Sequence, residues 1–544
     1  MSLSRDAYNS LEDIVGPENI SDEPAIMDSY AFQWAAELYR DGSKFMARPE
    51  AVLLPESTQE VQAIVRACNW YKIQCKPFST GWIVYAAPFH EGAILLDLRR
   101  MDRILEIDEK NMFAVIEPHV IGAQLQAEAM KVGLNTHMVG SGCASSPLAA
   151  ITSIFGHGPD SIYMGHSTEN MLGLEWVLPT GDILGIGSLG SGCGWFASEG
   201  PGPSLRGLIR GSIGARGAIG VFTKGAVKLS PWPGPAELPV KGTTPAYYSP
   251  LPENIRAYTI AFPNWNAYAD AHYKIYDAEI GYIFHRQFNL FGEDLQAAFL
   301  AMFTDPTKVL DDLEGLLERP DIKKLTEELK HSVQIVLAGN TPRDIAYQEK
   351  ALDYILAETG GRKVAWMSDP KMEMFTLLWL IRLSFKGTNM VYGGGYRGIF
   401  SQKGTPDFAV AYIEGAAEIL RKHQKLGLIA DTGGDSMMGP GGGMGGGGNA
   451  SFEQFCAYDS ADVESVRGAI ECFKDAAKAA KEMKLTPGYE ITVVQQYWTD
   501  EQKRQALLGM PQPSAYDWQR KIKEAFDPNN TGDELYTVAP PEKT

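Results

Sequence analysis

Hydrophobic and polar positions divide the first part of the chain into short strands and helices. Apolar runs at residues 51–54, 73–77 and 94–97 predict strands. After the first run, Ser57 and Glu60 are spaced as a capping box, which predicts the start of a helix. The apolar residues of that helix share one face, as expected of a helix packed on a sheet: Val61, Ile64, Val65 and Cys68.

A hairpin is predicted further along. Residues 172–178 and 183–186 read as two strands joined by a Pro-Thr-Gly turn at 179–181, with Pro and Gly where a type I turn favours them. The glycine-punctuated stretch 211–228 then leads into a strand at 221–229. Glycines at such spacing let the backbone approach a ligand or another segment closely.

The second half of the chain mixes strands with longer helices. A Pro- and Gly-rich linker at 234–252 separates it from the first half, and the N-terminal 48 residues read as a helical lead-in. The pattern predicts strands at 256–262 and 333–339 and helices at 266–278, 305–330, 341–359 and 460–481. This order of elements is typical of an α+β domain.

Length and charge narrow the possibilities. A chain of 544 residues is too long for one hydrophobic core, so two or more domains are expected. The formal net charge of −18 argues against nucleic acid and against an anionic membrane surface as partners. An anionic substrate would need a local basic pocket inside this acidic shell.

The cysteines, histidines and apolar runs argue against metal centres and membrane spans. None of the six cysteines forms a CxxC pair, and no histidine completes a zinc pattern, so no metal is predicted. The N-terminus shows no basic region followed by an apolar core, so no signal peptide is expected. The longest apolar run, 375–383, is too short for a bilayer and contains Arg382. We therefore expect a cytoplasmic protein with no membrane span.

Two ordered motifs resemble a known family. LGLEWVLPTGDIL is followed by GAIGVFTKGAVKLSPWP, and upstream a strand ends in Ile-Glu-Pro-His-Val at 116–120. The set resembles the FAD-binding domain of the vanillyl-alcohol oxidase / p-cresol methylhydroxylase (PCMH) flavoproteins, a superfamily that also contains FAD-linked 2-hydroxy-acid dehydrogenases. The resemblance implies an α+β fold, a two-subdomain PCMH-type FAD-binding domain with an α+β cap domain, and FAD as cofactor.

The resemblance also implies a division of the chain. Residues 1–240 would form the FAD-binding domain and residues 241–495 the cap over the flavin ring. The ending WQRKIKEAFDPNNTGDELYT is similar to the family's closing segment, so residues 496–544 would return to the FAD-binding domain.

Small residues mark where the family places its cofactor. A loop of small residues after a strand can cradle phosphates with its backbone N–H groups. The family usually has several glycines in this loop, whereas here Gly81 follows Ser79 and Thr80. The predicted cofactor-binding residues are Phe78, Ser79, Thr80, Gly81, Trp82, Cys143, Pro147, Thr152, Gly158, Gly214, Gly220 and Val221.

Three further residues of this domain leave alternatives open. His119 stands where the family usually has glycine, either as a flavin neighbour or as a turn histidine with a satisfied hydrogen bond. Some relatives attach the flavin through Cys or His, so Cys143 and His157 are candidates for a covalent bond. Otherwise Cys143 is a small buried hydrophobic residue.

The cap is expected to supply the chemistry. Two tyrosines and an arginine beside glycines suit the binding of a phenol or a carboxylate, and Arg382 lies just upstream. The candidate catalytic residues are Tyr392, Tyr396, Arg397 and Arg382, with His285 and His423 as weaker candidates for a base. The glycine-rich stretch 432–449 lacks the histidines of the dehydrogenases' metal motif, which argues against a metal-assisted enzyme.

The resemblance implies an FAD-dependent oxidoreductase. A dehydrogenase or oxidase of this kind takes a hydride from an alcohol, a hydroxy acid or an alkylphenol to flavin N5. The expected partners are a small-molecule substrate, a separate electron acceptor (a protein, a quinone or oxygen) and a second copy in a homodimer. Two alternatives remain: an FAD-holding electron-transfer subunit, and a redox-neutral flavin transferase of the alkylglycerone-phosphate synthase type.

Overall fold

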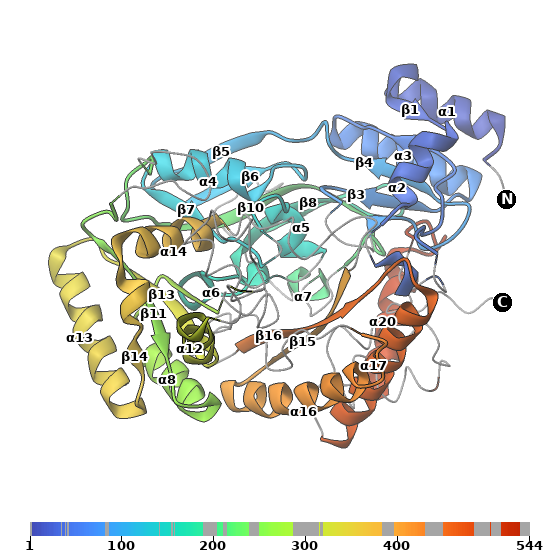
Figure 1. The fold of residues 1–544 in the computed structure, drawn as a ribbon. Helices are drawn as coiled ribbons and strands as arrows, with labels where there is room; N and C mark the ends of the chain where they lie inside the picture. The colour runs from blue at the N-terminus through green and yellow to red at the C-terminus, as the bar shows by residue number, and fades with distance from the viewer. Residues whose placement is uncertain are drawn as a thin grey trace.

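The fold is described from a computed structural model of the chain (Figure 1). The residues that it describes are 3–33, 35–38, 40, 43–81, 86–140, 142–153, 156, 158–188, 204–209, 215–238, 250–286, 315, 319–382, 396–429, 450–483, 501 and 513–533.

The first sheet is small and mostly parallel, in the order β1-β2-β4-β3. Its strands and the preceding and covering helices are α1 (Arg5–Val15), β1 (Ile20–Ser21), α2 (Pro24–Ala31), β2 (Val52–Leu53), α3 (Thr58–Tyr71), β3 (Cys75–Phe78) and β4 (Ile94–Asp97). Apolar residues of α1 and α3 share one core with β2 and β4. Ser57 accepts a hydrogen bond from the backbone N–H of Glu60 as predicted, but the Glu60 carboxylate accepts from Glu56 rather than completing the capping box.

The second sheet is antiparallel, in the order β5-β6-β10-β8-β9, with β7 paired to the end of β10. Its elements are β5 (Ile104–Asp108), β6 (Phe113–Ile116), α4 (Gly122–Lys131), β7 (Leu134–Thr136), α5 (Pro147–Thr152), β8 (Met171–Val177), β9 (Ile183–Ile186) and β10 (Val221–Pro231). The predicted hairpin is therefore β8–β9, and the strand after the glycines is the central strand β10. The short helices α6 (Ser161–Met164), η4 (Ser167–Asn170) and α7 (Arg206–Ile209) lie between these strands in the chain.

A third sheet, in the order β12-β13-β11-β14, forms the first part of the cap. Its elements are β11 (Ile255–Ala261), α8 (Trp265–Asp277), β12 (Ile283–His285), α12 (Pro320–Leu329), β13 (Ser332–Ala338), α13 (Pro342–Thr359), β14 (Arg362–Lys363), η5 (Ala365–Ser368) and α14 (Pro370–Arg382). Side chains alternate between the two sides of these strands. One side packs on α8 and α13, and the other packs on α14 and on residues of the first two sheets' domain.

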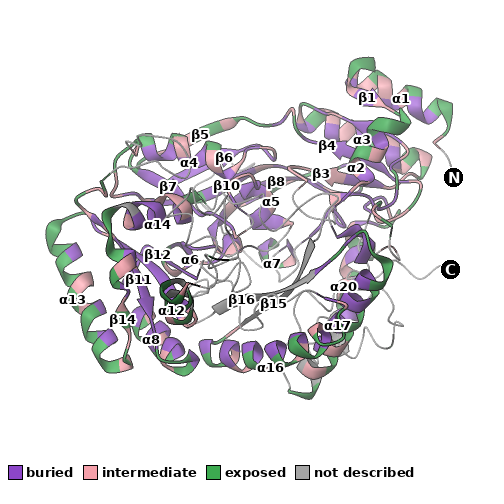
Figure 2. Cartoon of the chain, viewed as in Figure 1, coloured by how far each residue is buried: buried purple, intermediate pink, exposed green. Residues whose placement is uncertain are grey.

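The second part of the cap is a two-stranded ribbon with two long helices. It consists of β15 (Tyr396–Gly404), α16 (Pro406–Gln424), β16 (Ala450–Tyr458) and α17 (Val463–Glu482). Figure 2 shows that α13 and α16 present exposed residues on one side and buried residues on the other. Ala36 and Leu38, from η2 (Ala36–Leu38), pack in the same core as α16 and α17, so the N-terminal segment reaches the cap.

The last described segment lies against the first sheet. After α20 (Pro513–Phe526), Gly532 forms a parallel bridge with Cys75 of β3. The buried Lys76 amine donates to the Asp533 carbonyl at 3.0 Å and lies 3.7 Å from its carboxylate. The architecture is thus α+β, with two sheets on one side, a cap on the other, and a C-terminal segment that lies against β3.

Candidate functional site

The loop after β3 has the features of a phosphate cradle. Gly81 adopts a φ of +65°, and a Cβ there would lie 2.2 Å from the ring of Phe78, so glycine is required for the turn. Among the described residues, no group accepts a hydrogen bond from the backbone N–H of Ser79, Thr80 or Gly81. Three N–H groups in a partly exposed loop are therefore available to an anionic ligand.

The Pro118 carbonyl brings two distant segments to this loop. It accepts hydrogen bonds from the hydroxyls of Ser79 and of Ser146, which precedes α5. The wall behind the loop is aromatic, because the ring of Tyr30 packs edge-on against Phe78 at 5.2 Å between centroids. The Tyr30 hydroxyl is held in turn by a 2.6 Å hydrogen bond to Asp97 at the end of β4.

Two predicted glycines stand where a side chain would collide with backbone. A Cβ on Gly158 would lie 1.7 Å from the Met138 carbonyl oxygen. Gly220 has a φ of +113°, and a Cβ there would lie 2.3 Å from the Val177 carbonyl oxygen. Gly158 thus allows close packing against the segment at Met138, and Gly220 against the end of β8.

The other predicted cofactor residues lie in three places. Cys143 is half-buried beside the cradle, where its carbonyl accepts from the first turn of α4, and Pro147 begins α5. The Thr152 carbonyl accepts from Ala215, which joins α5 to the segment before β10. Val221 packs in the core between α3 and the sheets, so its backbone rather than its side chain is available. Trp82, Gly214 and His157 lie outside the described residues.

His119 is half-buried next to the Pro118 carbonyl. Burial lowers the pKa of its imidazole, the Asp97 carboxylate opposes that effect, and the Arg99 guanidinium adds to it. Its backbone N–H donates to the Met101 carbonyl, as a turn residue's would.

A polar chain that is buried from Gln126 inward joins the cap to the FAD-binding half. The Arg382 guanidinium donates to Gln126 on α4, the Gln126 amide donates to Asn135 on β7, and the Asn135 amide donates to the Tyr282 hydroxyl before β12. Tyr282 also stacks against Tyr163 of α6 at 4.8 Å between centroids. Arg382 therefore lies at the seam between cap and FAD-binding half, held by the α4 side.

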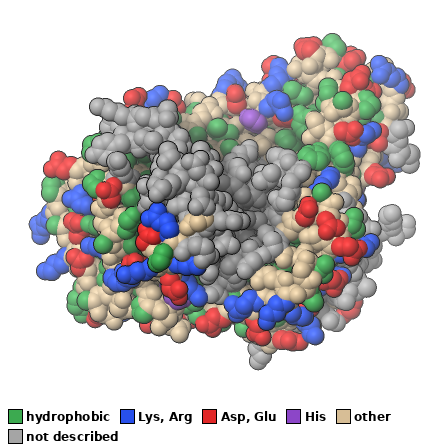
Figure 3. Space-filling model, in the orientation of Figure 1, with side chains coloured by type: hydrophobic (Ala, Val, Ile, Leu, Met, Phe, Trp, Pro, Cys, Tyr) green, Lys and Arg blue, Asp and Glu red, His purple; other side chains and the backbone are tan. Residues whose placement is uncertain are grey.

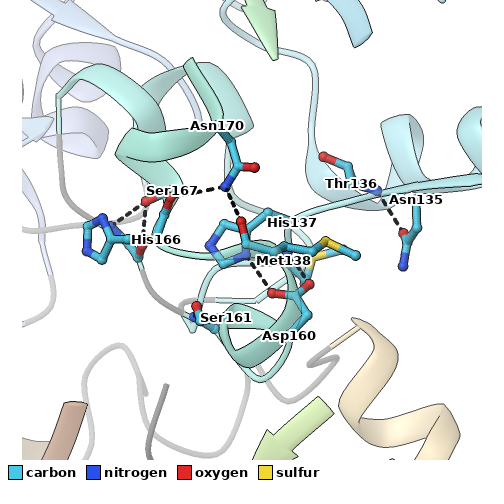
Figure 4. Close-up of polar contacts among 12 residues, drawn as sticks. Asn135, Thr136, His137, Met138, Asp160, Ser161, His166, Ser167 and Asn170 are labelled. Carbon is cyan, nitrogen blue, oxygen red and sulfur yellow. Dashed lines mark hydrogen bonds and ion pairs between the residues drawn. The ribbon is translucent and has the colours of Figure 1, made fainter. Parts of the chain in front are cut away.

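At the same seam, His137 and Asp160 form a buried imidazole–carboxylate pair (Figure 4). His137 Nδ1 lies 2.5 Å from one carboxylate oxygen, and the other oxygen accepts from the Met138 N–H at 2.7 Å. The side chains are 5% exposed each. The residue before Asp160, Pro159, accepts a hydrogen bond at 2.8 Å from the Phe284 N–H of β12. The sequence analysis did not identify this pair.

A row of polar side chains crosses the inner side of the cap sheet. Thr259 of β11 is in register with Gln334 of β13, which is in register with His285 of β12. Phe284 packs on α8, so its neighbour His285 points to the opposite side, the side on which Ile283 contacts the FAD-binding half. All three polar side chains are buried. We name them the polar row.

Within the described residues, two members of the polar row, Thr259 and His285, lack the partners that buried polar groups normally have. In the described part of the chain, neither nitrogen of His285 nor the hydroxyl of Thr259 has a hydrogen-bond partner. Burial lowers the pKa of His285 to about 4, so the imidazole is neutral at neutral pH. His285, a weak candidate from sequence, thus lies at the seam with two open nitrogens.

The remaining cap candidates are placed by their backbone alone. Tyr396 and Arg397 begin β15, opposite Tyr458 and Ala457 of β16. Tyr392 and the glycine-rich stretch lie outside the described residues. His423 lies on α16, where Nε2 is 2.9 Å from Asp475, far along the chain from the polar row.

Comparison with known proteins shows what the FAD-binding half and the fold are similar to. Residues 49–187 match the FAD binding domain family. The crystal structure of p-cresol methylhydroxylase with substrate bound superposes with a TM-score of 0.69 at 17% identity, covering 98% of each chain. Residues 49–187 are thus similar to an FAD binding domain, and the chain as a whole shares the fold of p-cresol methylhydroxylase.

Two curated relatives match part of the length of this chain. The glycolate oxidase subunit GlcD of Bacillus subtilis is 27% identical over 232 residues, 42% of this chain and 46% of the relative. An uncharacterized FAD-linked oxidoreductase of Mycobacterium tuberculosis is 31% identical over 221 residues, 40% of this chain and 44% of the relative. The chain thus spans less than half the length of these relatives.

The residues present fit FAD, and the prediction of FAD as cofactor is confirmed. The open N–H groups of residues 79–81 suit the pyrophosphate, and Gly158 and Gly220 keep the surrounding backbone close. Within the described ranges, no three His, Cys, Asp or Glu side chains gather as a metal site. In those same ranges, no helix combines the length and the apolar character that a bilayer crossing requires.

Proposed function

We propose that this chain is a PCMH-type flavoprotein and acts as an FAD-dependent oxidoreductase, which takes a hydride from the carbon of a small alcohol, hydroxy acid or alkylphenol. The flavin, when bound, accepts the hydride and its two electrons. The chain's own residues must hold the cofactor, bind and orient the donor, exclude water and take up a proton. The proposal rests on the FAD-binding domain together with the chemistry of the seam.

The observation that carries the proposal is the polar row. A subunit that only stored FAD would gain stability from an apolar seam, since each unsatisfied buried polar group costs roughly 1–3 kcal/mol. Thr259 and His285 instead keep open hydrogen-bonding groups on the cap side that faces the FAD-binding half. Destabilising polar groups retained at a domain seam are typical of a substrate site.

We assign separate tasks to the two sides of the seam. The backbone of residues 79–81 would hold the pyrophosphate. His285 and Gln334 would bind and orient the polar group of the donor, because a neutral imidazole both donates and accepts. Tyr392, Tyr396 and Arg397 remain proposed catalytic residues from the resemblance. Arg382 is proposed in the same set, although Gln126 holds it in the structure.

The division of the chain is part of the proposal. Residues 1–240 would form the FAD-binding domain, residues 241–495 the cap and residues 496–544 the returning segment. Burial of the Cys75–Gly532 bridge and of Asp533 against β3 supports the last assignment. The homodimer and the separate electron acceptor remain predictions.

Side-chain charges on the visible face do not favour one donor. In Figure 3, Lys and Arg side chains lie beside Asp and Glu side chains around the edge of the face. The donors are therefore chosen from the names of relatives: glycolate, D-lactate, D-2-hydroxyglutarate and 4-cresol. These compounds cover hydroxy acids and alkylphenols.

The test is anaerobic reduction of the FAD-loaded protein, followed in a stopped-flow spectrophotometer, with each of the four donors. We expect at least one donor to bleach the flavin. His285→Leu should slow bleaching at least about tenfold, the loss of one hydrogen bond to the donor. The same change should leave stability unchanged or higher, because it removes an unsatisfied buried group.

His272→Leu is the matched control. His272 lies on α8, is buried, has two unpartnered nitrogens within the described residues and packs on Phe284 from the far side of the cap sheet. It should gain stability with no change in bleaching. If His285→Leu and His272→Leu behave alike, the polar row is not the substrate site. If no donor bleaches the wild type, an electron-transfer subunit or a redox-neutral transferase becomes the better account.

A further inference from the structure

We infer that His137 is a further catalytic residue: its Nε2 accepts the hydroxyl proton of the donor substrate, while Asp160 acts as a positioning residue. The inference rests on the proposed function. This inference assigns a proton acceptor to the FAD-binding side of the seam. The sequence motifs predicted no base there, and the candidate bases of the cap lie on the other side.

The geometry fixes the orientation of the imidazole. A carboxylate oxygen only accepts, so the short contact to Asp160 places the hydrogen on Nδ1 of His137. In the neutral tautomer Nε2 is then an acceptor. Asp160 cannot swing away, because its second oxygen holds the Met138 N–H. Figure 4 shows the ring of His137 beside the Asp160 carboxylate.

A purely structural role for His137 does not explain its second ring nitrogen, Nε2. Nε2 of His137 is buried, and it has no hydrogen-bond partner in the described part of the chain. An asparagine or glutamine would tie the same loop to Asp160 without a second ring nitrogen. A buried acceptor that the protein does not satisfy is available to a ligand that donates a hydrogen bond.

The position of the pair favours the substrate, rather than the phosphates of the cofactor, as the ligand of His137 Nε2. Pro159, next to Asp160, accepts from Phe284, and Asn135, two residues before His137, donates to Tyr282. Both flanks of the pair are thus tied to β12, whose last residue, His285, belongs to the polar row. The pair therefore lies where the FAD-binding half contacts β12, the strand that carries His285.

The step balances as follows. The O–H bond of the donor breaks and its proton goes to Nε2 of His137. A C–H bond breaks, on the carbon that bears the OH in an alcohol or hydroxy acid and on the benzylic carbon in an alkylphenol. Its electron pair would leave with the hydrogen as hydride to the flavin when bound, which would take up two electrons. The carbon is oxidised by two electrons and forms C=O, or a quinone methide in the case of an alkylphenol. The Asp160 carboxylate stabilises the imidazolium that results.

The first test is the pH dependence of flavin bleaching by whichever of the four donors reacts fastest. Loss of a general base costs on the order of 10²–10⁴-fold in rate. We expect His137→Gln to slow bleaching by that amount and to remove the acid limb of the profile. Asp160→Asn should slow bleaching by a smaller factor. His272→Gln, a buried histidine away from the seam, should keep both rate and profile.

Other titratable groups around the pair do not mimic this result. Burial raises the pKa of Tyr163 and of Tyr282, so both stay protonated through the acid limb. Burial lowers the pKa of His285 to about 4, which is below the pH range in which the acid limbs of the rate profiles are compared. The charged groups of the neighbouring η4 segment are Glu169 and, at its start, His166. His166→Gln is therefore measured in parallel and should keep the acid limb.

The second test does not need turnover. The ring nitrogens of ¹⁵N-histidine-labelled wild type, assigned with His137→Gln, are recorded without FAD, with FAD, and after anaerobic reduction in the presence of donor. We expect the signal of Nε2 to be that of an open acceptor with and without FAD, and to change when donor is present. A change on adding FAD alone would show that Nε2 binds the flavin and would overturn the inference.

The two proposals fail separately. A wild type that no donor bleaches contradicts the proposed oxidoreductase. A wild type that bleaches while His137→Gln keeps the rate and the acid limb contradicts the role of His137 alone. Should His137→Gln fail to hold FAD, its FAD-free form still assigns the wild-type nitrogen signals, which decide whether Nε2 is open. Should it fail to fold, His137→Asn takes its place in the assignment.

Discussion

Replacement of Lys523 by methionine should separate the C-terminal segment from the FAD-binding domain. The Lys523 amine is fully buried and donates to the carbonyls of Ala218 at 2.7 Å and Gly532 at 2.9 Å, and it forms an ion pair with Asp527. Methionine keeps most of the side-chain volume but removes the charge and all three contacts. The Asp527 carboxylate is then left buried without its cation.

The expected cost is large because the pair is buried. Breaking a buried ion pair by removing one partner costs about 3–5 kcal/mol. Asp527 keeps its hydrogen bonds from the N–H groups of Thr531 and Gly532, so we expect the lower half of this range. At a urea dependence of about 1–3 kcal/mol/M, the unfolding midpoint falls by roughly 1–4 M.

The assay follows FAD release by fluorescence during urea unfolding. Ala218 lies just before Gly220 and β10, so loss of this contact should release FAD at lower urea. Lys521→Met is the control on the same helix, since Lys521 is exposed and only lies over the ring of Trp518 at 4.6 Å. Equal midpoints for Lys523→Met and Lys521→Met would refute the reasoning. Adding Asp527→Asn to Lys523→Met should recover part of the loss.

Two further predictions concern a glycine and a buried histidine. Gly158→Ala should lower the FAD content of the purified protein, because its Cβ would collide with the Met138 carbonyl, whereas Gly207→Ala, which meets nothing within 4 Å, should keep full FAD. Burial lowers the pKa of His272 to about 4, so the folded state binds this proton less readily than the unfolded chain. The part of the free energy of unfolding that depends on this titration, about 3 kcal/mol, is fully present above pH ~6.5 and is lost as pH falls toward 4. His272→Leu should therefore flatten the loss of unfolding midpoint between these pH values, and an unchanged slope would contradict the assignment.

Local patterns predicted many elements well. The strand at 183–186 is β9 with the same bounds, and the strand at 94–97 is β4. The helix predicted at 341–359 begins after its cap Thr341 and ends at Gly360, which adopts the left-handed conformation. Such ends depend on residues a few positions apart, which the sequence displays directly. The predicted helix at 305–330 is described only at its end, as α12.

The site depends on pairings that no local pattern displays. His137 and Asp160 are 23 residues apart, on either side of a small-residue segment that carries no periodicity. The polar row requires the register of three strands, because Thr259, Gln334 and His285 become neighbours only when β13 lies between β11 and β12. A polar residue within an otherwise apolar strand, as Gln334 is, was the available signal.

The most direct test of the account is an absorption spectrum of the purified protein, recorded anaerobically before and after addition of each donor and again on the supernatant after acid precipitation. The account predicts flavin bands that at least one hydroxy acid or alkylphenol bleaches. FAD should remain in the supernatant if it is bound non-covalently, and in the pellet if Cys143 or His157 binds it covalently. A colourless protein that FAD does not restore would contradict the cofactor assignment, and a yellow protein that no donor bleaches would contradict the oxidoreductase.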